Sequence, residues 1–359
     1  MCALRLSQDE FFYFEMLRNI GHASYHEADI SEVLRAAGQI ARGDIESFYS
    51  AFFALAERTA SQAKRSEPTT LSGKRHTLEA SGFSIPIIFY SAAAEPDAKK
   101  GPRPTLIADT GFDGTQEEMF HVIGFAALRR GWNVITYEGP GQPSRVVTPV
   151  VDWAFAQAKA LDIDTGKLGL WGESMGSYLA PRAAAFEHRV AAVFAVDGVF
   201  DCYQPYSRFT RPKGQEPPAE RKAEEFNAYI RDLLRDPNTP TAARWGIGHG
   251  LWSFSDGDAG SMRDSTEPMS PYDFMAKVKN FTLLGLEDKI QCPVLEGHAE
   301  NDLFFAGQPE LLAEALSKKA TMIKLTDADG AGEHCHSGAG ILKAQVMLDW
   351  FQKVVIDKN

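Results

Sequence analysis

The segment Leu168–Gly176, LGLWGESMG, constrains the fold of this chain more than any other. An apolar stretch runs into the pattern G-x-S-x-G, and a helix-compatible stretch from Tyr178 to Ala180 follows it. The glycines are required because side chains two residues before and two after the serine would clash in so tight a turn. A strand, a sharp turn and a helix in this order predict a nucleophile elbow with Ser174 at its tip. The alternative is a plain glycine-rich turn with a capping serine.

From about residue 75 onward, short apolar stretches alternate with helical patterns. This alternation predicts an α/β protein with a mostly parallel sheet covered by helices on both faces. A nucleophile elbow on such a sheet predicts the α/β-hydrolase fold. We expect strands at 85–90, 105–109, 132–137, 168–171, 190–196, 294–296 and 322–325, and helices at 150–161, 177–186, 310–317 and 341–355.

Two further segments extend this core. Residues 1–70 predict three helices rich in aromatic residues, beginning near Ser7, Asp29 and Asp44, with Ser7 and Glu10 as a capping box for the first. Residues 202–284 are far more than a crossover connection needs, and they contain a helical pattern at 219–234. We therefore expect a helical N-terminal segment over 1–70, a core over 71–201 and 285–359, and a cap over 202–284, inserted after the sixth strand.

The fold places the partners of the serine in the order acid, then histidine. Asp302 follows the strand expected at 294–296 and is the predicted acid, and Glu300 is its rival. After the last strand, a glycine-containing loop carries His334 and His336. We predict His334 as the general base, because its imidazole must reach Ser174 while its other nitrogen bonds the carboxylate. His336 is then a structural histidine.

The run Glu-His-Cys-His at 333–336 suggests metal ligation as an alternative. Its spacing does not match common zinc sites, so no metal and no cofactor are expected. Cys335 is not expected to be a nucleophile, because nothing places it on a tight elbow.

Backbone and pocket groups complete the predicted site. Two N–H groups are needed for an oxyanion hole, and the candidates are Met175 and Phe112, the latter in the loop after the strand at 105–109. Glu138 is a candidate for the pocket wall, with turn chemistry as the alternative. Trp252 and Phe254 are candidates for an aromatic cradle together with Trp245, and packing of the cap on the core explains them equally well.

The composition narrows the class of partner. The net charge of −11 argues against nucleic acid and anionic membranes as main partners, since both reward clustered Lys and Arg. The four cysteines form no C-x-x-C pair and predict reduced thiols. No signal-peptide pattern and no apolar run long enough to span a bilayer is seen, which favours a cytoplasmic protein.

Several motifs together resemble one subfamily of α/β-hydrolases. It contains the fungal heptaketide hydrolase of the yellowish-green pigment pathway, the bacterial 2,6-dihydroxypseudooxynicotine hydrolase, and polyketide thiohydrolases, acyltransferases and cyclases. One departure is Ser177, where the subfamily pattern leads us to expect glycine. The motifs are TGFDGTQEEM from Thr110, YEGPGQ from Tyr137, GESMG around Ser174, GEHCHSGA around His334, and Phe14, Arg18, Gly21 and AFFALA from Ala51.

The resemblance implies a Ser-Asp-His triad, a helical cap built from the N-terminus and an insertion, and no metal. It implies a polyketide-type small-molecule substrate, free or bound to a carrier protein. Hydrolysis of an ester or thioester, or cleavage of a C–C bond beside a ketone, is the expected reaction. Acyl transfer or macrolactone formation from an acyl-Ser174 intermediate is the alternative, followed by a peptidase, a simple carboxylesterase and a non-enzymatic binding module. Whether the N-terminal helices form a lid or a homodimer contact stays open.

Overall fold

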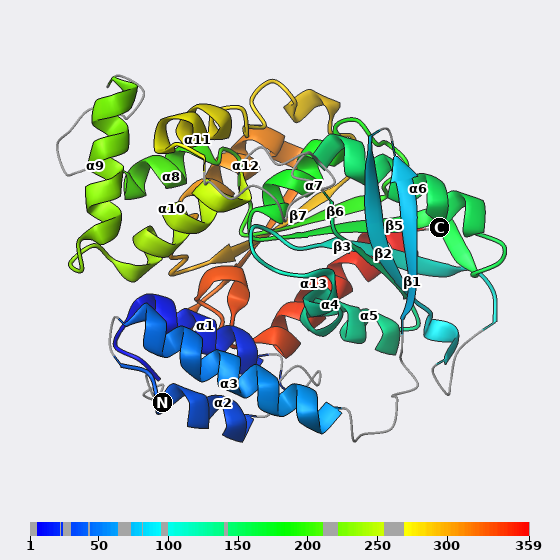
Figure 1. Cartoon of the computed structure of the whole chain (residues 1–359). Coiled ribbons are helices and arrows are strands. Elements are labelled where there is room, and N and C mark those ends of the chain that lie inside the picture. Colours follow the sequence, from blue (N-terminus) through cyan, green and yellow to red (C-terminus); the bar gives the residue numbers. More distant parts are fainter. Residues whose placement is uncertain are drawn as a thin grey trace.

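The computed structural model describes residues 6–21, 23, 30–41, 44–63, 73–80, 82–94, 100–139, 143–210, 222–254 and 269–358. Within these residues the chain forms an eight-stranded sheet in the order β1-β2-β4-β3-β5-β6-β7-β8, shown in Figure 1. Strands β3 to β8 pair in parallel, whereas β2 pairs antiparallel with both β1 and β4. The strands are β1 Lys74–Ala80, β2 Phe83–Tyr90, β3 Arg103–Asp109, β4 Asn133–Tyr137, β5 Ile163–Glu173, β6 Ala192–Val196, β7 Val294–Ala299 and β8 Ala320–Leu325.

All seven predicted strands are confirmed, with shifts of a few residues at their ends. The prediction of strands missed β1, which is an edge strand with mostly exposed side chains. Its sequence, KRHTLEA, lacks the apolar run that marks a strand buried on both faces. The mostly parallel sheet and the α/β class are therefore as expected.

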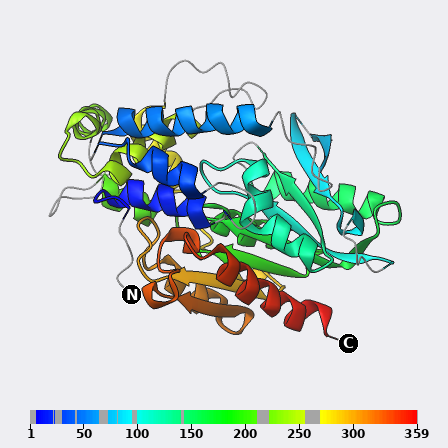
Figure 2. The same cartoon turned by 90° about the horizontal axis from the view of Figure 1, so that it is seen from below.

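Helices cover both faces of the sheet (Figure 2). Side chains alternate across each strand, so Ile107 and Leu170 belong to one core, while Leu106 and Trp171 belong to the other. Helices α6, α7 and α12 pack on the first face, and α4, α5 and α13 pack on the second. Their bounds are α4 Gln116–Met119, α5 Phe125–Arg129, α6 Pro143–Gln157, α7 Gly176–Ala184, α12 Gln308–Leu316 and α13 Gly340–Phe351.

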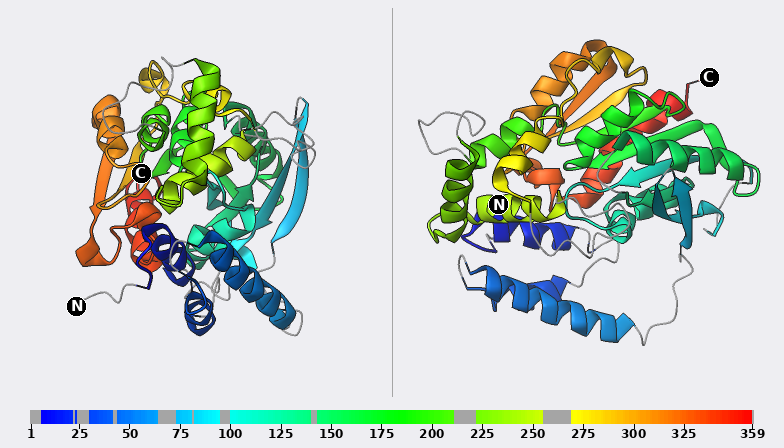
Figure 3. Two further views of the ribbon diagram at one scale, coloured as in Figure 1. Left: turned by 60° about the vertical axis from the view of Figure 1, so that its left-hand side comes forward. Right: turned by 45° about the horizontal axis from the view of Figure 1, so that its top comes forward.

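Three N-terminal helices pack beside the sheet (Figure 3): α1 Glu10–Gly21, α2 Ile30–Ala37 and α3 Ile45–Ala63. The expected capping box of Ser7 and Glu10 is wrong, because Oδ1 of Asp9 accepts the first N–H groups of α1. The expected start near Asp44 is confirmed by its carboxylate, which accepts two N–H groups of α3. The expected start at Asp29 lies outside the described residues. In this segment the ring of Phe12 stacks on Phe48, with centroids 4.6 Å apart.

The insertion between β6 and β7 is helical, with α8 Tyr203–Phe209, α9 Ala223–Arg235, α10 Thr241–Ser253 and α11 Pro271–Val278. Its two ends meet at a neck where Asp201 bridges Thr282. The neck is reinforced by the N–H groups of Cys202 and Leu283, which donate across it. The helix expected at 219–234 corresponds to α9. The aromatic, glycine-rich stretch that follows forms α10, which packs against α1 through Phe11 and Trp245, 5.1 Å apart.

None of the described helices is long and apolar enough to cross a bilayer. Cys202, Cys292 and Cys335 are free thiols, and Cys2 lies outside the described residues.

The stacking of α1 on α3 predicts that Phe12 stabilises the fold. Phe12 is fully buried, so Phe12→Ala should lower the free energy of unfolding by about 3 kcal/mol through lost burial and the cavity left behind. Phe53→Ala is the matched control, because 53% of that side chain is exposed and its loss should cost less than about 1 kcal/mol. Urea unfolding measures both, and equal losses would contradict the packing described.

Candidate active site

Ser174 stands at the tip of a strained turn between β5 and α7. Its φ of +57° lies in the left-handed region, which non-glycine residues seldom adopt. A Cβ on Gly172 would overlap the carbonyl oxygen of Gly176, and a Cβ on Gly176 would lie 2.7 Å from the carbonyl oxygen of Thr110. The predicted clash within the turn is confirmed for Gly172, whereas Gly176 is required by the close approach of the loop after β3.

The loop after β3 touches this elbow. A Cβ on Gly111 would lie 2.8 Å from the N atom of Met175 and 2.9 Å from Cβ of Ser174. The two backbone segments that carry the predicted oxyanion donors, at Met175 and Phe112, therefore lie next to each other beside Ser174. The ring of Phe112 packs against His249, with centroids 4.7 Å apart, and helps to line the cavity.

The structure brings Ser174, His334 and Asp302 together. His334 lies on the turn after β8, and its Nε2 is 2.9 Å from Oγ of Ser174. Its Nδ1 is 3.0 Å from Oδ1 of Asp302, which also accepts the N–H groups of Phe304 and Phe305. His334 and Asp302 are both buried. In the neutral imidazole, Nδ1–H can donate to the carboxylate while Nε2 accepts the serine proton.

A second carboxylate, Asp197, contacts the same nitrogen. Oδ2 of Asp197 lies 3.0 Å from Nδ1 of His334, and the side chain is fully buried. Asp197 also accepts hydrogen bonds from the N–H and the thiol of Cys335. Asp197 was not among the predicted site residues, although a signal was present. It directly follows a buried strand, β6, whose carboxyl end must lie beside that of β7 in a parallel sheet.

Glu300 and His336, the alternatives to Asp302 and His334 as acid and base, make other contacts. Glu300 is exposed, and its carboxylate accepts the N–H of Asp327. His336 is fully buried and donates from Nδ1 to the carbonyl of Ala331, while its Nε2 lies beside Gly297, within β7. His336 is thus a structural histidine, and the ring that reaches Ser174 is that of His334.

The buried charges set the proton affinity of His334. Burial by itself would lower the pKa of His334, but the carboxylates of Asp197 and Asp302 outweigh it and hold that pKa well above 6.5. Burial likewise opposes the charge of Asp197, yet His334 lowers the pKa of this carboxyl to about 2. The two carboxylates therefore favour the protonated form of the His334 ring.

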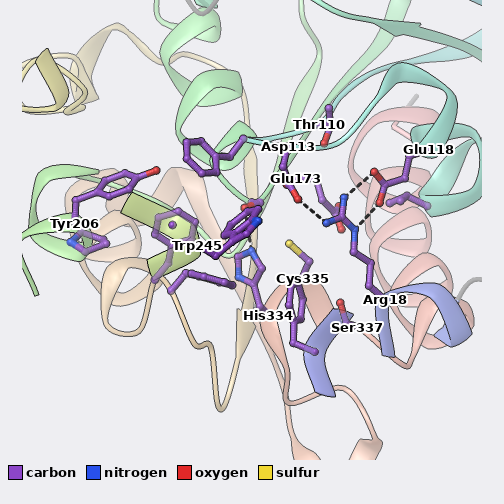
Figure 4. Close-up of a pocket in the computed structure, with 18 of the residues that line it drawn as sticks. Arg18, Thr110, Asp113, Glu118, Glu173, Tyr206, Trp245, His334, Cys335 and Ser337 are labelled. Carbon is purple, nitrogen blue, oxygen red and sulfur yellow. Dashed lines mark hydrogen bonds and ion pairs between the residues drawn. The ribbon is translucent and has the colours of Figure 1, made fainter. Parts of the chain in front are cut away.

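Ser174 opens into a cavity with two kinds of wall (Figure 4). Aromatic side chains of α1, the cap and the loop after β7 form one part, and charged side chains form the other. Such a cavity fits a substrate with a large apolar body and a polar end. The aromatic lining is Phe14, Phe112, Tyr206, Phe209, Trp245, Phe304 and Phe305, and the polar lining includes Arg18, Thr110, Asp113, Glu118, Glu173 and Ser337.

Arg18 of α1 lies at the centre of the charged wall. Its guanidinium donates twice to Glu118, at 2.6 and 2.7 Å, and once to Asp113, at 2.8 Å. These carboxylates raise the pKa of Arg18 further, against the effect of its burial. Burial also raises the pKa of neighbouring Glu15 to about 7. The motif TGFDGTQEEM thereby supplies the two acids that hold α1 against the active site.

A second buried ion pair supports the elbow from behind. Nζ of Lys343, on α13, lies 2.7 Å from Oε1 of Glu173, and Nε1 of Trp171 donates to the other carboxylate oxygen at 2.8 Å. Glu173 directly precedes the nucleophile, so this contact ties the last helix to the turn. Lys343 was not among the residues predicted from the sequence.

Three predicted pocket residues do not line the cavity. The carboxylate of Glu138 instead accepts the N–H of Gln116, the first residue of α4. Trp252 is 50% exposed and lies two helical turns, about 10 Å, beyond Trp245 along α10. Phe254 packs inside the cap between Phe274 and Phe281. Trp245 alone of the predicted aromatic cradle lines the cavity.

Among the described residues, Asp197, His334 and Cys335 place possible metal-binding atoms within 4.8 Å of one another. These atoms already hydrogen-bond to one another. Burial and the charge of Asp197 raise the pKa of the Cys335 thiol well above its usual value, which suits its role as a hydrogen-bond donor to that carboxylate. Hydrogen bonding accounts for the cluster.

We expect the reactivity of Ser174 to rise with pH. Only the neutral imidazole accepts the serine proton, and the raised pKa keeps His334 protonated at pH 6.5. The rate of Ser174 labelling by a fluorophosphonate, followed by intact mass between about pH 5 and pH 10, should therefore reach half of its maximum above the ordinary histidine pKa of about 6.5. A midpoint at or below that value would contradict the electrostatics described, and His334→Ala supplies the background rate.

Removing the charge of Arg18 should destabilise the protein more than removing a surface charge. Arg18→Gln leaves Asp113 and Glu118 without their cation, which should lower the free energy of unfolding by about 2–4 kcal/mol at neutral pH. The loss should shrink in acid, once Asp113, whose pKa Arg18 holds below its usual value, takes up a proton. Arg75→Gln is the control, since its pair with Glu117 is exposed and worth less than about 1 kcal/mol. Equal losses in urea unfolding would contradict this account.

The chain is similar to known proteins, in agreement with the fold described above. No protein-family model matches the chain. The chain is 26% identical to the hydrolase LUC6 of Fusarium sp, over 96% of each chain. It is 25% identical to the 20-hydroxy-prefusarin hydrolase FUS2 of Gibberella moniliformis, over 98% of each.

Solved structures with the same fold include 2,6-dihydroxy-pseudo-oxynicotine hydrolase, with a TM-score of 0.53 and 18% identity over 96% of this chain and 89% of that one. The carboxylesterase EstE1 from a metagenomic library matches with a TM-score of 0.51 and 14% identity over 83% of this chain and 94% of that one. The protein thus has the α/β-hydrolase fold, and over nearly its whole length it is similar to fungal proteins that are named hydrolases.

Proposed function

We propose that this protein is a serine hydrolase that acts on a polyketide-type substrate through an acyl-Ser174 intermediate. The observation that carries the proposal is the 2.9 Å contact between Oγ of Ser174 and Nε2 of His334, whose Nδ1 lies against buried carboxylates. This contact lies at the wall of a largely aromatic cavity. Serine, base and acid in hydrogen-bond reach are the arrangement that activates a hydroxyl as a nucleophile.

In the first half of the reaction, His334 removes the Ser174 proton as Oγ forms a bond to the substrate carbonyl carbon. The carbonyl electron pair moves to oxygen, and the N–H groups of Met175 and Phe112 stabilise this oxyanion. When the carbonyl re-forms, the bond to the leaving group breaks. An alkoxide or thiolate leaves with the proton that His334 returns, and the acyl group stays on Ser174.

In the second half, water adds to the acyl carbon while His334 takes one of its protons. The bond to Oγ then breaks, Ser174 regains its proton from His334, and a carboxylic acid leaves. A carbon leaving group follows the same course when a second carbonyl stabilises its carbanion, which the proton from His334 quenches. C–C cleavage beside a ketone therefore needs no further group.

The class of substrate follows from the cavity and from the relatives. The aromatic wall suits a large, unsaturated apolar body. A relative that matches 98% of this chain is named as a hydrolase of 20-hydroxy-prefusarin. The carboxylates of Asp113 and Glu118 are engaged by Arg18, so they do not offer a free acidic pair for the α-amine of a peptide. This favours an uncharged acyl substrate, free or carried as a thioester, over a peptide.

Intact-mass spectrometry after brief mixing with a β-keto acyl thioester tests the proposal. We expect an acyl adduct on the wild-type protein, its loss in Ser174→Ala, and release of thiol reduced by about 10⁴-fold or more in the variant. Free acid as the product identifies a hydrolase, whereas a lactone identifies the cyclase alternative that uses the same acyl-enzyme. A fluorophosphonate that labels Ser174→Ala as fast as wild type would refute the assignment of the nucleophile.

A further inference from the structure

We infer that His334 is held by two carboxylates, and that Asp197 is a positioning residue that shares with Asp302 the orientation and protonation of the imidazole. This inference rests on the proposed role of His334 as the base for Ser174. It goes beyond a triad with one acid, because each carboxylate is placed to hold the ring when the other is removed.

The geometry at Nδ1 is symmetrical. The nitrogen lies 3.0 Å from Oδ2 of Asp197 and 3.0 Å from Oδ1 of Asp302, and all three side chains are buried. A single N–H cannot donate fully to both oxygens, so the second carboxylate contributes mainly through its charge. Two buried negative charges at this distance favour the imidazolium that forms when His334 takes the serine proton.

The backbone around Asp197 is built to keep the carboxylate in place. Its φ is +79°, a strained conformation that aspartate tolerates better than most residues, and its N–H donates to the carbonyl of Gly297 at the end of the neighbouring strand β7. Two residues on, the N–H of Val199 donates to Oγ of Ser177 at 3.0 Å. The serine that departs from the expected glycine thereby anchors the turn that carries Asp197.

Asp197 also fixes the loop of the base. Both of its oxygens lie 3.0 Å from the N atom of Cys335, the residue after His334, and its Oδ2 accepts the Cys335 thiol at 2.9 Å. Cys335 itself has a φ of +54°. One side chain therefore holds both the backbone and the ring of the histidine loop.

Other charged groups face His334 from neighbouring elements. Glu15 of α1 and Asp113 of the loop after β3 interact with it electrostatically, and both are ion-paired to the guanidinium of Arg18, which also binds Glu118. His336, on the loop of His334, faces Asp197 and is held neutral, because burial lowers its pKa. Asp197 and Asp302 are the carboxylates in direct contact with the ring among the described residues.

The histidine titration tests the inference without any substrate. In protein labelled with ¹⁵N-histidine, with His334→Ala assigning the signal, Asp197→Asn should lower the pKa of His334 by about 1 or more. Asp201→Asn is the matched control: this nearby carboxylate accepts the N–H groups that open α8, and its loss should leave the pKa of His334 unchanged. An unchanged pKa in Asp197→Asn would show a merely structural residue and overturn the inference.

The rate of Ser174 labelling by a fluorophosphonate then tests whether Asp197 and Asp302 share one role or act independently. We expect Asp197→Asn and Asp302→Asn each to slow labelling of Ser174 by about 10-fold, and the double variant by about 10⁴-fold, as in an enzyme without a triad acid. The fold-reduction in labelling rate of the double variant should exceed the product of the two single fold-reductions by at least tenfold. The reason is that each carboxylate can orient the ring when the other is absent. A double loss equal to that product would overturn the inference.

Asp302→Asn keeps the inference testable if Asp197→Asn does not fold. With Asp197 in place, the pKa of His334 should stay above about 6.5 and labelling should persist, whereas a pKa below that value with labelling abolished would overturn the inference. Failure of the proposed function is distinct, since it would appear as labelling that does not depend on Ser174. The titration of His334 remains informative in that case.

Discussion

The close approach of three backbone segments at Ser174 is the constraint on which the rest of the site depends. β5, the start of α7 and the loop after β3 meet where no Cβ fits at Gly172, Gly176 or Gly111. This packing forces Ser174 into its positive φ and points its hydroxyl away from the sheet. It also brings the loop that carries Phe112 next to the backbone of Met175. The nucleophile and the two segments that carry the proposed oxyanion donors are thus held by the same close backbone packing.

Around this contact the protein buries charge, and two of the ion pairs join different elements. Lys343 of α13 neutralises Glu173 behind the elbow, and Arg18 of α1 neutralises Glu118 and Asp113 beside it. Removing one partner of such a pair leaves an uncompensated charge, which costs far more than the pair contributes. These contacts therefore serve to specify one arrangement of α1, α13 and the elbow rather than to add stability.

The N-terminal helices belong to this arrangement. Phe14 lies edge-on to the ring of His334, with centroids 5.4 Å apart, and Gly21 approaches the backbone of Gly338 so closely that a Cβ would lie 2.6 Å from its N atom. Helix α1 thus packs on the histidine loop and forms part of the cavity wall. Residues of α1 and of the cap helices line the cavity at Ser174, so these elements shape the space beside the nucleophile.

The sequence by itself determined the parts that depend on local pattern: the elbow, the buried strands, and the order Ser174, Asp302, His334 along the chain. An edge strand such as β1 leaves little apolar signal, and so it was missed. Only the tertiary structure decided which residues meet across the sheet. Asp197 reaches His334 because β6 lies beside β7, and Arg18 reaches Glu118 from 100 residues away. Such contacts depend on packing between segments that are distant in the sequence. The spacing of motifs along the chain therefore does not predict them.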